Sequence, residues 1–600
     1  MAGLHKPGEF RPHVLRDYAF IADGERGALI GPHGEIAWMC APRWDSDAVF
    51  GSLIGARGVY SVTPVGRFVW GGYYEPDSLI WRSRWVTETG VIECREALAF
   101  PGEQDRTVVL RRICAIEGDA RLQVELEARA GFGSSALTHL ERNHSVWTAR
   151  TGSLNLRWQG APAAHPSSGR SHRRLIMDLE VPAGDSHDLA LEIAEGELPE
   201  DPVDCEMAWR RTETSWRGAV PGLDGCLSPD EARHSYAVLR GMTSSTGGLV
   251  AAATMSLPER AEAGRNYDYR YVWIRDQCYA GHAAAAARDS SLLSDSVRFV
   301  TARLLEDGPQ LVPAYTAAGG RVPDQRQLDL PGYPGGFDLV GNWVNKQFQL
   351  DAFGDALLLL AEAADAGLID ADGLDAVETA ADSIAARWTE PDAGIWEIDN
   401  QPWTHSRLTA VAGLRAISAL PSIPGRGREW LALADRIAAD TAAHAVHQDG
   451  HWQRSPGDPG LDGSLLLPSL RGAVSPTDPR TIATIDAYRR QLTVDGYAYR
   501  FRHDDRPLSE AEGSFTLCGF VMAMAACQQE RWVEARSWWE RSRASCGPGM
   551  LYSEEYDTSE HQMRGNLPQA FVHALMLESA AMLGSTPART DHDSVGVKTG

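Results

Sequence analysis

The segment Arg265–Asp276 (RNYDYRYVWIRD) combines aromatic rings with charges: its twelve residues include four aromatic side chains, three arginines and two aspartates. Flat rings stack on the apolar faces of sugars, and arginine and aspartate side chains form paired hydrogen bonds with sugar hydroxyls. The segment therefore predicts a carbohydrate-binding pocket. A structural network of Arg–Asp ion pairs at a domain seam is the alternative interpretation.

Two acidic sites farther along the chain could supply catalytic carboxyl groups. In the first, Glu397 follows Trp396 in a glycine-containing loop, GIWE. A carboxyl group that is desolvated beside an indole has a raised pKa, which a general acid at neutral pH requires. The alternative is a surface glutamate next to a tryptophan that packs inward.

The second acidic site is Leu551–Asp557, in which Glu554, Glu555 and Asp557 lie within four residues and two tyrosines flank them. Crowding of like charges separates their titrations, so that one carboxylate can stay ionised as a base. Glycoside hydrolysis needs one protonated and one ionised carboxyl group, and in an inverting enzyme the two stand about 6.5–9.5 Å apart to admit a water. A solvated acidic loop is the alternative.

Composition argues against several other classes of function. The net charge of −24 disfavours a nucleic-acid partner or an anionic membrane surface. The chain has no Walker-type phosphate loop, no HExxH and no His/Cys cluster with zinc spacing, so we expect no cofactor and no metal. Its nine cysteines include no CxxC pair, and we see neither a secretory signal nor a membrane span. A cytoplasmic location is therefore expected.

The elements that must position these residues fall into two groups. In the first third of the chain, apolar Leu122, Val124 and Leu126 alternate with polar residues, which predicts an antiparallel strand with one wet face. Segments 107–113 and 188–193 have similar patterns, and many short strands without helices between them indicate a β-sandwich over residues 1–203. A Trp-rich helical linker is expected at 204–227.

From about residue 228 onward the pattern is helical. Leu350, Phe353, Leu357 and Leu360 share one helix face, and further helices are expected at 374–388, 429–446, 481–493, 516–544 and 568–583. About a dozen helices of ordinary length fit in this part. They could close into an (α/α) double ring or stack as a solenoid, and we find no internal repeat that decides. The small, polar tail 586–600 is expected to be disordered.

Several motifs, taken in order, resemble glycoside hydrolase family 15, the glucoamylase-like enzymes that include glucodextranases and bacterial trehalases. They are RDYAFIAD at 16–23, GEIAW at 34–38, PRWDS at 42–46, TGGLVAA at 246–252, SLPE at 256–259, the segment 265–276, the block 341–354, EGSF at 512–515 and GNLPQAF at 565–571. The resemblance spans most of the chain. It implies a β + α two-domain fold: an N-terminal antiparallel β-sandwich, a helical linker and an (α/α)6 barrel over 228–585.

The resemblance also implies an activity and roles for individual residues. The family hydrolyses α-glucosidic bonds with inversion, from the non-reducing end, without a redox or metal cofactor. Glu397 matches its general acid and Glu554 its general base, with Glu555 as the second choice for the base. Arg275 and Asp276 match the pair that holds the terminal sugar, and Trp273, Trp396 and Tyr556 are expected to form walls of the pocket.

The substrate is the open question, because the chain departs from the family pattern near the expected mouth of the pocket. Residues 332–340 lack a Ser and Pro-Val-Arg run that many relatives carry, Lys346 replaces a neutral or acidic residue, and 398–403 replaces a Gly/Arg-rich stretch. We expect an exo-acting hydrolase of small α-linked gluco-oligosaccharides, with trehalase action as a close alternative. A non-catalytic sugar-binding protein on the same fold is the alternative from another class. The sequence is also compatible with a homo-oligomer.

Overall fold

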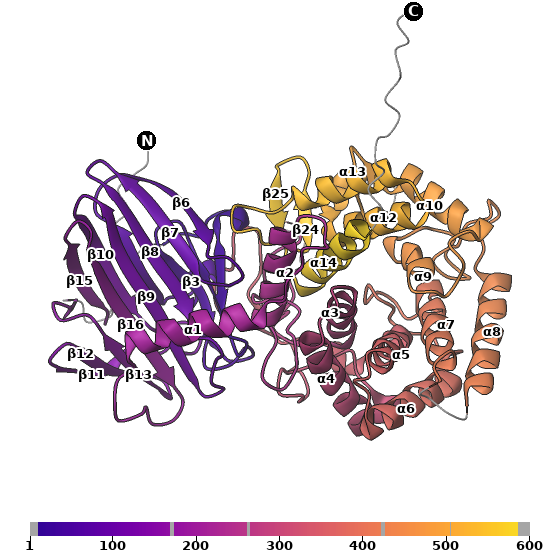
Figure 1. Ribbon diagram of the computed structural model, residues 1–600, viewed down its shortest axis with the longest axis horizontal. Coiled ribbons are helices and arrows are strands. Elements are labelled where there is room, and N and C mark those ends of the chain that lie inside the picture. The colour runs from indigo at the N-terminus through magenta and orange to yellow at the C-terminus, as the bar shows by residue number, and fades with distance from the viewer. Residues whose placement is uncertain (1–9, 168–172, 261–264, 422–425, 504–505, 586–600) are drawn as a thin grey trace, which may run out of the picture.

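The computed structural model describes residues 10–167, 173–260, 265–421, 426–503 and 506–585. In Figure 1 a sheet-rich part formed by the N-terminal third lies beside a ring of helices formed by the rest of the chain. This arrangement is the predicted β-sandwich followed by an (α/α)6 barrel. The predicted tail, 586–600, lies outside the described residues.

Two eight-stranded antiparallel sheets form the sandwich. The first sheet has the order β1 (Ala19–Ala22), β2 (Gly27–Ile30), β3 (Glu35–Cys40), β5 (Val59–Pro64), β10 (Ala120–Glu127), β15 (Leu175–Val181) and β14 (His165–Pro166), with β4 (Ala48–Phe50) paired to β3. The second has the order β11 (Thr138–Asn143), β12 (Val146–Thr151), β13 (Leu154–Gln159), β16 (Ser186–Ala194), β9 (Arg106–Glu117), β8 (Val91–Leu98), β7 (Trp81–Thr87) and β6 (Phe68–Tyr74).

The sandwich core lies between the sheets. Leu122, Val124 and Leu126 of β10 are buried in it, as the alternation predicted. The expected wet face of β10 is exposed only in its first half: Arg121 is exposed and Gln123 partly so, whereas Glu125 and Glu127 are buried. Arg174 and Arg129 form ion pairs with these two carboxylates, which makes their burial tolerable.

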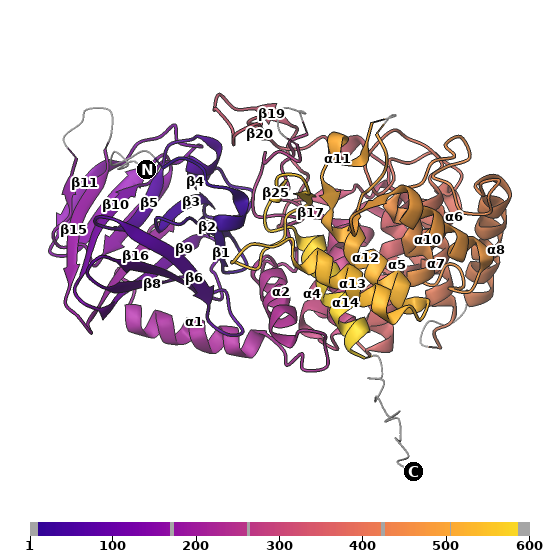
Figure 2. The same cartoon turned by 90° about the horizontal axis from the view of Figure 1, so that it is seen from above.

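Helix α1 (Cys205–Ala219) connects the two parts and crosses the sandwich, where it contacts β16. Figure 2 shows it running along one side of the sheets toward the barrel. The helix begins at Asp204, whose side chain accepts a hydrogen bond from the Met207 N–H and thus satisfies a donor of the first turn. Its buried Trp216 stacks on Phe100 of the sandwich, with ring centroids 4.0 Å apart.

Six inner helices close a ring in which each contacts the next, and the last contacts the first. They are α3 (Ile274–Ala286), α5 (Leu350–Asp365), α7 (Thr404–Ser418), α9 (Leu467–Leu470), α12 (Thr516–Gln528) and α14 (Ala570–Gly584). The outer helices are α2 (Pro229–Gly241), α4 (Ser291–Asp307), α6 (Ala371–Arg387), α8 (Gly427–His444), α10 (Pro479–Gln491) and α13 (Trp532–Arg543). Closure of this ring answers the question that the sequence left open between a barrel and a solenoid.

One helix expectation was wrong. The segment 516–544 is not one helix but the inner helix α12 and the outer helix α13, separated at 529–531. Glu530 in this turn has a positive φ of 58°, a conformation in which a helix cannot continue. The continuous apolar and aromatic pattern of the two helices concealed the turn. None of the described helices has the length and apolarity needed to cross a membrane.

Candidate active site

A cavity of about 360 Å³ lies at the N-terminal ends of the inner helices. This volume is in the range of small-molecule sites. Five of the residues that the sequence singled out line the cavity: Trp273, Arg275, Trp396, Glu397 and Glu554. The structure therefore brings together two carboxyl groups that are far apart in the chain.

Glu397 lies on a tight turn between α6 and α7, and its own backbone has a positive φ of 54°. The turn is held from behind by Asp392, whose carboxylate accepts hydrogen bonds from the Gly394 N–H and the Ser406 hydroxyl, both at 2.8 Å. On the cavity side, the Trp273 indole N–H donates to Glu397 Oε1 at 2.5 Å. Burial raises the pKa of Glu397, and the nearby Arg275 opposes this shift.

Glu554 is buried and lies in the segment of chain that connects α13 to α14, immediately before strand β24 (Glu555–Asp557). The Tyr269 hydroxyl donates to its Oε1 at 3.3 Å. Its Oε2 is buried and has no hydrogen-bond partner among the described residues, so this oxygen can accept a proton from a water. Burial and the charge of Glu259 hold the pKa of Glu554 well above its usual range.

The segment Arg265–Asp276 physically links the two carboxyl groups. Tyr269, which binds Glu554, packs edge-on against Trp273, which binds Glu397, and their ring centroids are 5.4 Å apart. The sequence analysis did not identify Tyr269 as a site residue. The period-2 spacing of Tyr267, Tyr269, Tyr271 and Trp273 was the available signal, because alternate residues of an extended segment share one face.

The same segment also contains the ion pair that the alternative interpretation required. Arg270 and Asp268 are fully buried and joined at 2.7 Å. Arg270 also donates to the backbone carbonyl of Ser46 in the sandwich at 2.7 Å. Both interpretations therefore apply, to different residues: Arg270 and Asp268 brace the seam, whereas Arg265, Tyr267 and Tyr269 line the cavity.

Arg275 and Asp276 occupy the first turn of α3 and have different environments. Arg275 lines the cavity, and its Nη1 donates to the Ile395 carbonyl at 2.6 Å. Asp276 is fully buried behind it and accepts a hydrogen bond from Arg275 Nε at 3.0 Å. Asp276 therefore orients Arg275 and is not among the residues that line the cavity.

Glu555 and Tyr556 also do not line the cavity. Glu555 begins β24, where its Oε2 accepts a hydrogen bond from the Gly513 N–H at 2.9 Å and its Oε1 lies 3.7 Å from Arg500. Tyr556 stacks on Tyr497, with ring centroids 5.7 Å apart. The expectation that these two residues contact the sugar has no support in this geometry.

The sequence did not predict a group of charged side chains that lies beside Glu554. Arg500 donates to Glu512 at 2.8 Å and to Glu259 at 3.4 Å, and Arg265 donates to the same Glu512 oxygen at 3.0 Å. The pKa of Glu512 is lowered to about 2, because the favourable Arg500 and His503 interactions outweigh its burial. Glu259 and Glu512 lie in motifs of the family resemblance, but no pattern marked Arg500 or His503.

Trp343 marks the outer rim of the cavity, and about half of its surface is exposed. Lys346 is exposed and lies over the Trp343 ring, with its Nζ 5.1 Å from the ring centroid. Lys346 itself is not among the lining residues. The departure from the family pattern at this position therefore affects the rim through Trp343.

Two buried carboxyl groups on one small cavity lined by aromatic rings and guanidinium groups, in an (α/α)6 barrel, are typical of a glycoside hydrolase. Comparison with known proteins gives the same class. Residues 233–581 match the model of glycosyl hydrolases family 15, and residues 8–153 match the model "Trehalase-like, N-terminal". The chain belongs to glycosyl hydrolase family 15.

Similar proteins extend over both parts of the chain. A trehalase of Mycobacterium tuberculosis is 29% identical over 97% of this chain and 91% of its own length. Trehalase 1 of Sulfolobus acidocaldarius is 27% identical over 94% of this chain and 98% of its own. A bacterial glucoamylase solved with acarbose has the same fold, with a TM-score of 0.70 and 14% identity over 97% of this chain and 96% of its own.

Proposed function

We propose that this protein hydrolyses α,α-trehalose to two glucose molecules with inversion at one anomeric carbon. The observation that carries the proposal is the similarity to trehalases, which extends over 97% of the chain and includes the sandwich as well as the barrel. From the sequence, small α-linked gluco-oligosaccharides were the first expectation and trehalose the alternative. The similar proteins favour trehalose.

The shape and polarity of the cavity support a disaccharide. It is small, and its walls contain three guanidinium groups (Arg265, Arg275 and Arg500) and three carboxyl groups (Glu259, Glu397 and Glu554). Such groups hydrogen-bond hydroxyls in pairs. Trehalose presents hydroxyls on both rings, so a small cavity lined by these donors and acceptors suits it.

In the proposed reaction Glu397 protonates the bridging oxygen while the C1–O bond breaks. A water attacks the opposite face of C1, and Glu554 takes the proton that this water loses. Burial raises the pKa of both carboxyl groups, and the charge of Glu259 also raises that of Glu554. The assignment of the acid role to Glu397 and the base role to Glu554 rests on their match to the family motifs. The hydrogen bond from Tyr269 and the charges of Arg500 and Arg275 favour the ionised base.

Proton NMR of the reaction tests this function. An inverting enzyme releases α-glucose and β-glucose from trehalose in equal amounts before mutarotation, whereas a retaining enzyme releases only the α-anomer. Maltose, isomaltose and a longer maltodextrin should be hydrolysed much more slowly. Release of glucose from maltose in preference to trehalose would overturn the assignment of substrate, and an all-α product would overturn inversion.

We also propose that the enzyme acts in the cytosol. The proposal rests on the composition of the cysteines, of which Cys40, Cys94, Cys278 and Cys518 are buried thiols, as is usual in a reducing compartment. Fractionation of the source cells with an antibody against the protein tests it. Recovery outside the cytosolic fraction would contradict it.

A further inference from the structure

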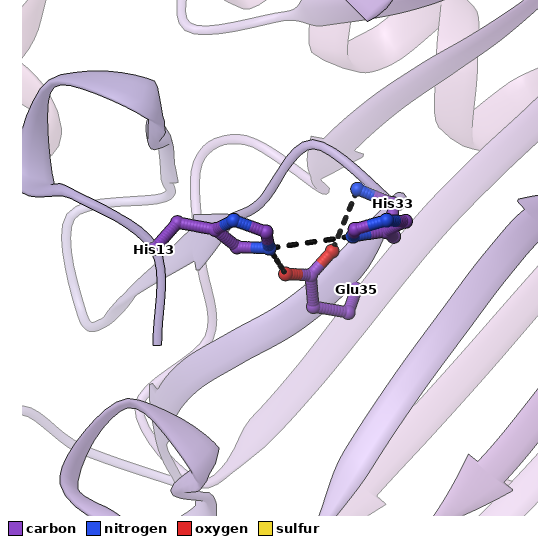
Figure 3. Close-up of side chains that lie close together, drawn as sticks. All are labelled: His13, His33 and Glu35. Atoms are coloured by element: carbon purple, nitrogen blue, oxygen red, sulfur yellow. Dashed lines mark hydrogen bonds and ion pairs between the residues drawn. The ribbon is translucent and has the colours of Figure 1, made fainter. Parts of the chain in front are cut away.

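A cluster of three side chains outside the cavity has the composition of a divalent-metal site. His13 precedes the sandwich strands, and His33 and Glu35 come from the hairpin that joins β2 to β3. Figure 3 shows the two imidazole rings and the carboxylate converging on one point. One atom from each, His13 Nε2, His33 Nδ1 and Glu35 Oε1, lies within 4.8 Å of the others.

The separations of these atoms match those of metal ligands. His13 Nε2 is 3.3 Å from His33 Nδ1 and 3.2 Å from Glu35 Oε1. Zinc bonds to nitrogen and oxygen are about 2.0–2.2 Å long, which places two donors of a tetrahedral site roughly 3.3 Å apart. Two imidazoles and one carboxylate form a ligand set that zinc and similar borderline ions accept, with a water as the fourth ligand.

Hydrogen bonds alone satisfy the cluster poorly. His13 Nε2 can carry one proton, but it faces two atoms at hydrogen-bonding distance. That proton can be shared with Glu35 Oε1, which lies 3.2 Å away and is buried without another hydrogen-bond donor among the described residues, or with His33, but not fully with both. A buried carboxylate oxygen with one shared donor is incompletely satisfied. One cation between the three atoms would satisfy all of them.

Two glycines of the β2–β3 hairpin allow the Glu35 carboxylate to lie inside it. Glu35 is fully buried, and its other oxygen accepts the His33 N–H at 2.9 Å. At Gly31, a Cβ would come within 2.1 Å of Glu35 Oε1, so only glycine leaves space for this oxygen. Gly34 has a positive φ of 69°, which turns the chain between the two ligands of the hairpin.

We propose that His13, His33 and Glu35 bind one zinc-like divalent cation that fastens the segment before β1 to the sandwich. The site would also fix the seam with the barrel. The His13 N–H donates to the Tyr18 hydroxyl at 3.0 Å, and the His13 carbonyl accepts the hydroxyl of Tyr333, a barrel residue, at 2.8 Å. The role is structural, because none of the three ligands lines the active-site cavity.

The test measures metal directly on the full-length chain without a histidine tag. After removal of metals with a chelator and exposure to one equivalent of Zn²⁺ or Co²⁺, the wild type should retain one ion through gel filtration. The Co²⁺ form should show the visible bands of four-coordinate cobalt, and Zn²⁺ should raise the melting temperature. His13→Gln and His33→Gln should lose all three properties while trehalose hydrolysis and circular dichroism show that they are folded.

The matched control is His451→Gln, because His447, Asp449 and His451 form the other cluster of potential ligands among the described residues. This variant should retain the ion. Absence of a retained ion in the wild type would overturn the proposal, as would equal retention by His13→Gln and His33→Gln. Loss of the ion from His451→Gln alone would move the site to the other cluster and also overturn it.

Discussion

The Tyr269 hydroxyl provides a sharp test of how the site works, because it contacts Glu554 without belonging to the reacting groups. Tyr269→Phe removes the 3.3 Å hydrogen bond to Glu554 Oε1 and leaves the ring, which packs at 5.4 Å on Trp273. The variant therefore separates the hydrogen bond from the packing. We expect the protein to stay folded and Trp273 to keep its hydrogen bond to Glu397.

The expected magnitude follows from the charge of the acceptor. A hydrogen bond to a charged group contributes about 1.5–3 kcal/mol, and 1.4 kcal/mol corresponds to about a factor of ten in rate. Because 3.3 Å is long for an O–H donor, we expect the lower end of this range, a decrease in kcat of about tenfold.

The variant should also change the pH dependence in a defined direction. The Tyr269 hydrogen bond favours the ionised form of Glu554 and so lowers its pKa. Without it that pKa rises, and the base is protonated at a higher pH. The acidic limb of the kcat/KM profile should therefore move to higher pH in Tyr269→Phe, measured by glucose release from trehalose.

The control is Tyr556→Phe, because Tyr556 is close in sequence to the base but does not line the cavity. It should keep the wild-type profile. A Tyr269→Phe enzyme with an unchanged acidic limb and an unchanged kcat would show that the hydroxyl does not act on the base. A shift of the alkaline limb to higher pH with an unchanged acidic limb would reverse the assigned roles, because the raised pKa of Glu554 would then be that of the acid.

Three further predictions concern the roles of the carboxyl groups and the stability of their supports. Glu397→Gln should lower turnover of trehalose by about 10²–10⁴ but retain activity on α-glucosyl fluoride, whose leaving group needs no proton, whereas Glu554→Gln should lose both. Gly394→Ala should lower kcat and the melting temperature, because φ at this position is 66° and a Cβ would come within 2.6 Å of the Trp403 ring; such strain costs about 1–3 kcal/mol. Burial lowers the pKa of His405 to about 3, so between pH 6.5 and 3 the unfolded chain binds more protons than the folded protein. The folded protein therefore loses stability as the pH falls through this window. His405→Gln should reduce the stability lost between pH 7 and 5 by about 2 kcal/mol, measured by denaturant unfolding.

The glycine and histidine predictions each have a control variant on the same chain, and the two glutamate variants serve as controls for each other. Gly367→Ala has a similar φ of 71° and no atom within 4 Å of the added Cβ, so it should lower stability without a change in kcat. His139→Gln, at an exposed position, should leave the pH dependence of unfolding unchanged. Equal loss of fluoride hydrolysis in both glutamate variants would remove the distinction between acid and base. A Gly394→Ala enzyme with normal kcat would show that the turn does not position Glu397.

Much of the architecture could be predicted because short-range patterns determine it. The alternation in β10 and the helical spacing in α5 each place apolar residues on one face, and both elements formed as expected. The turn between α12 and α13 could not be predicted in this way, because both flanking segments favour helix and only Glu530 breaks the pattern. Ring closure also depends on contacts between distant helices, which local periodicity does not report.

The candidate site shows a similar division. Glu397, Glu554 and Arg275 stood out through their neighbours in sequence, and they do line one cavity. Arg500 and His503 have no distinctive neighbours, because their role comes from Glu512 and Arg265, which approach only after folding. Glu555 stood out for the same reason as Glu554, yet it contacts the Gly513 N–H and is not among the residues that line the cavity. Sequence proximity therefore identified the acidic site but not which of its carboxyl groups faces the substrate.

The contacts at the seam indicate that the sandwich is part of the catalytic scaffold. Tyr269 and Trp273 belong to one segment and donate hydrogen bonds to Glu554 and Glu397, respectively. Arg270 lies between these two residues in sequence and fixes the segment by donating to the Ser46 carbonyl of the sandwich. The Trp38 indole of β3 also donates to the Ala253 carbonyl of the barrel at 2.8 Å. Loss of the partners of a buried arginine such as Arg270 would strongly destabilise the folded protein. The placement of Glu397 and Glu554 therefore depends on contacts from both parts of the chain, which gives a physical reason why the similarity to trehalases extends through the sandwich.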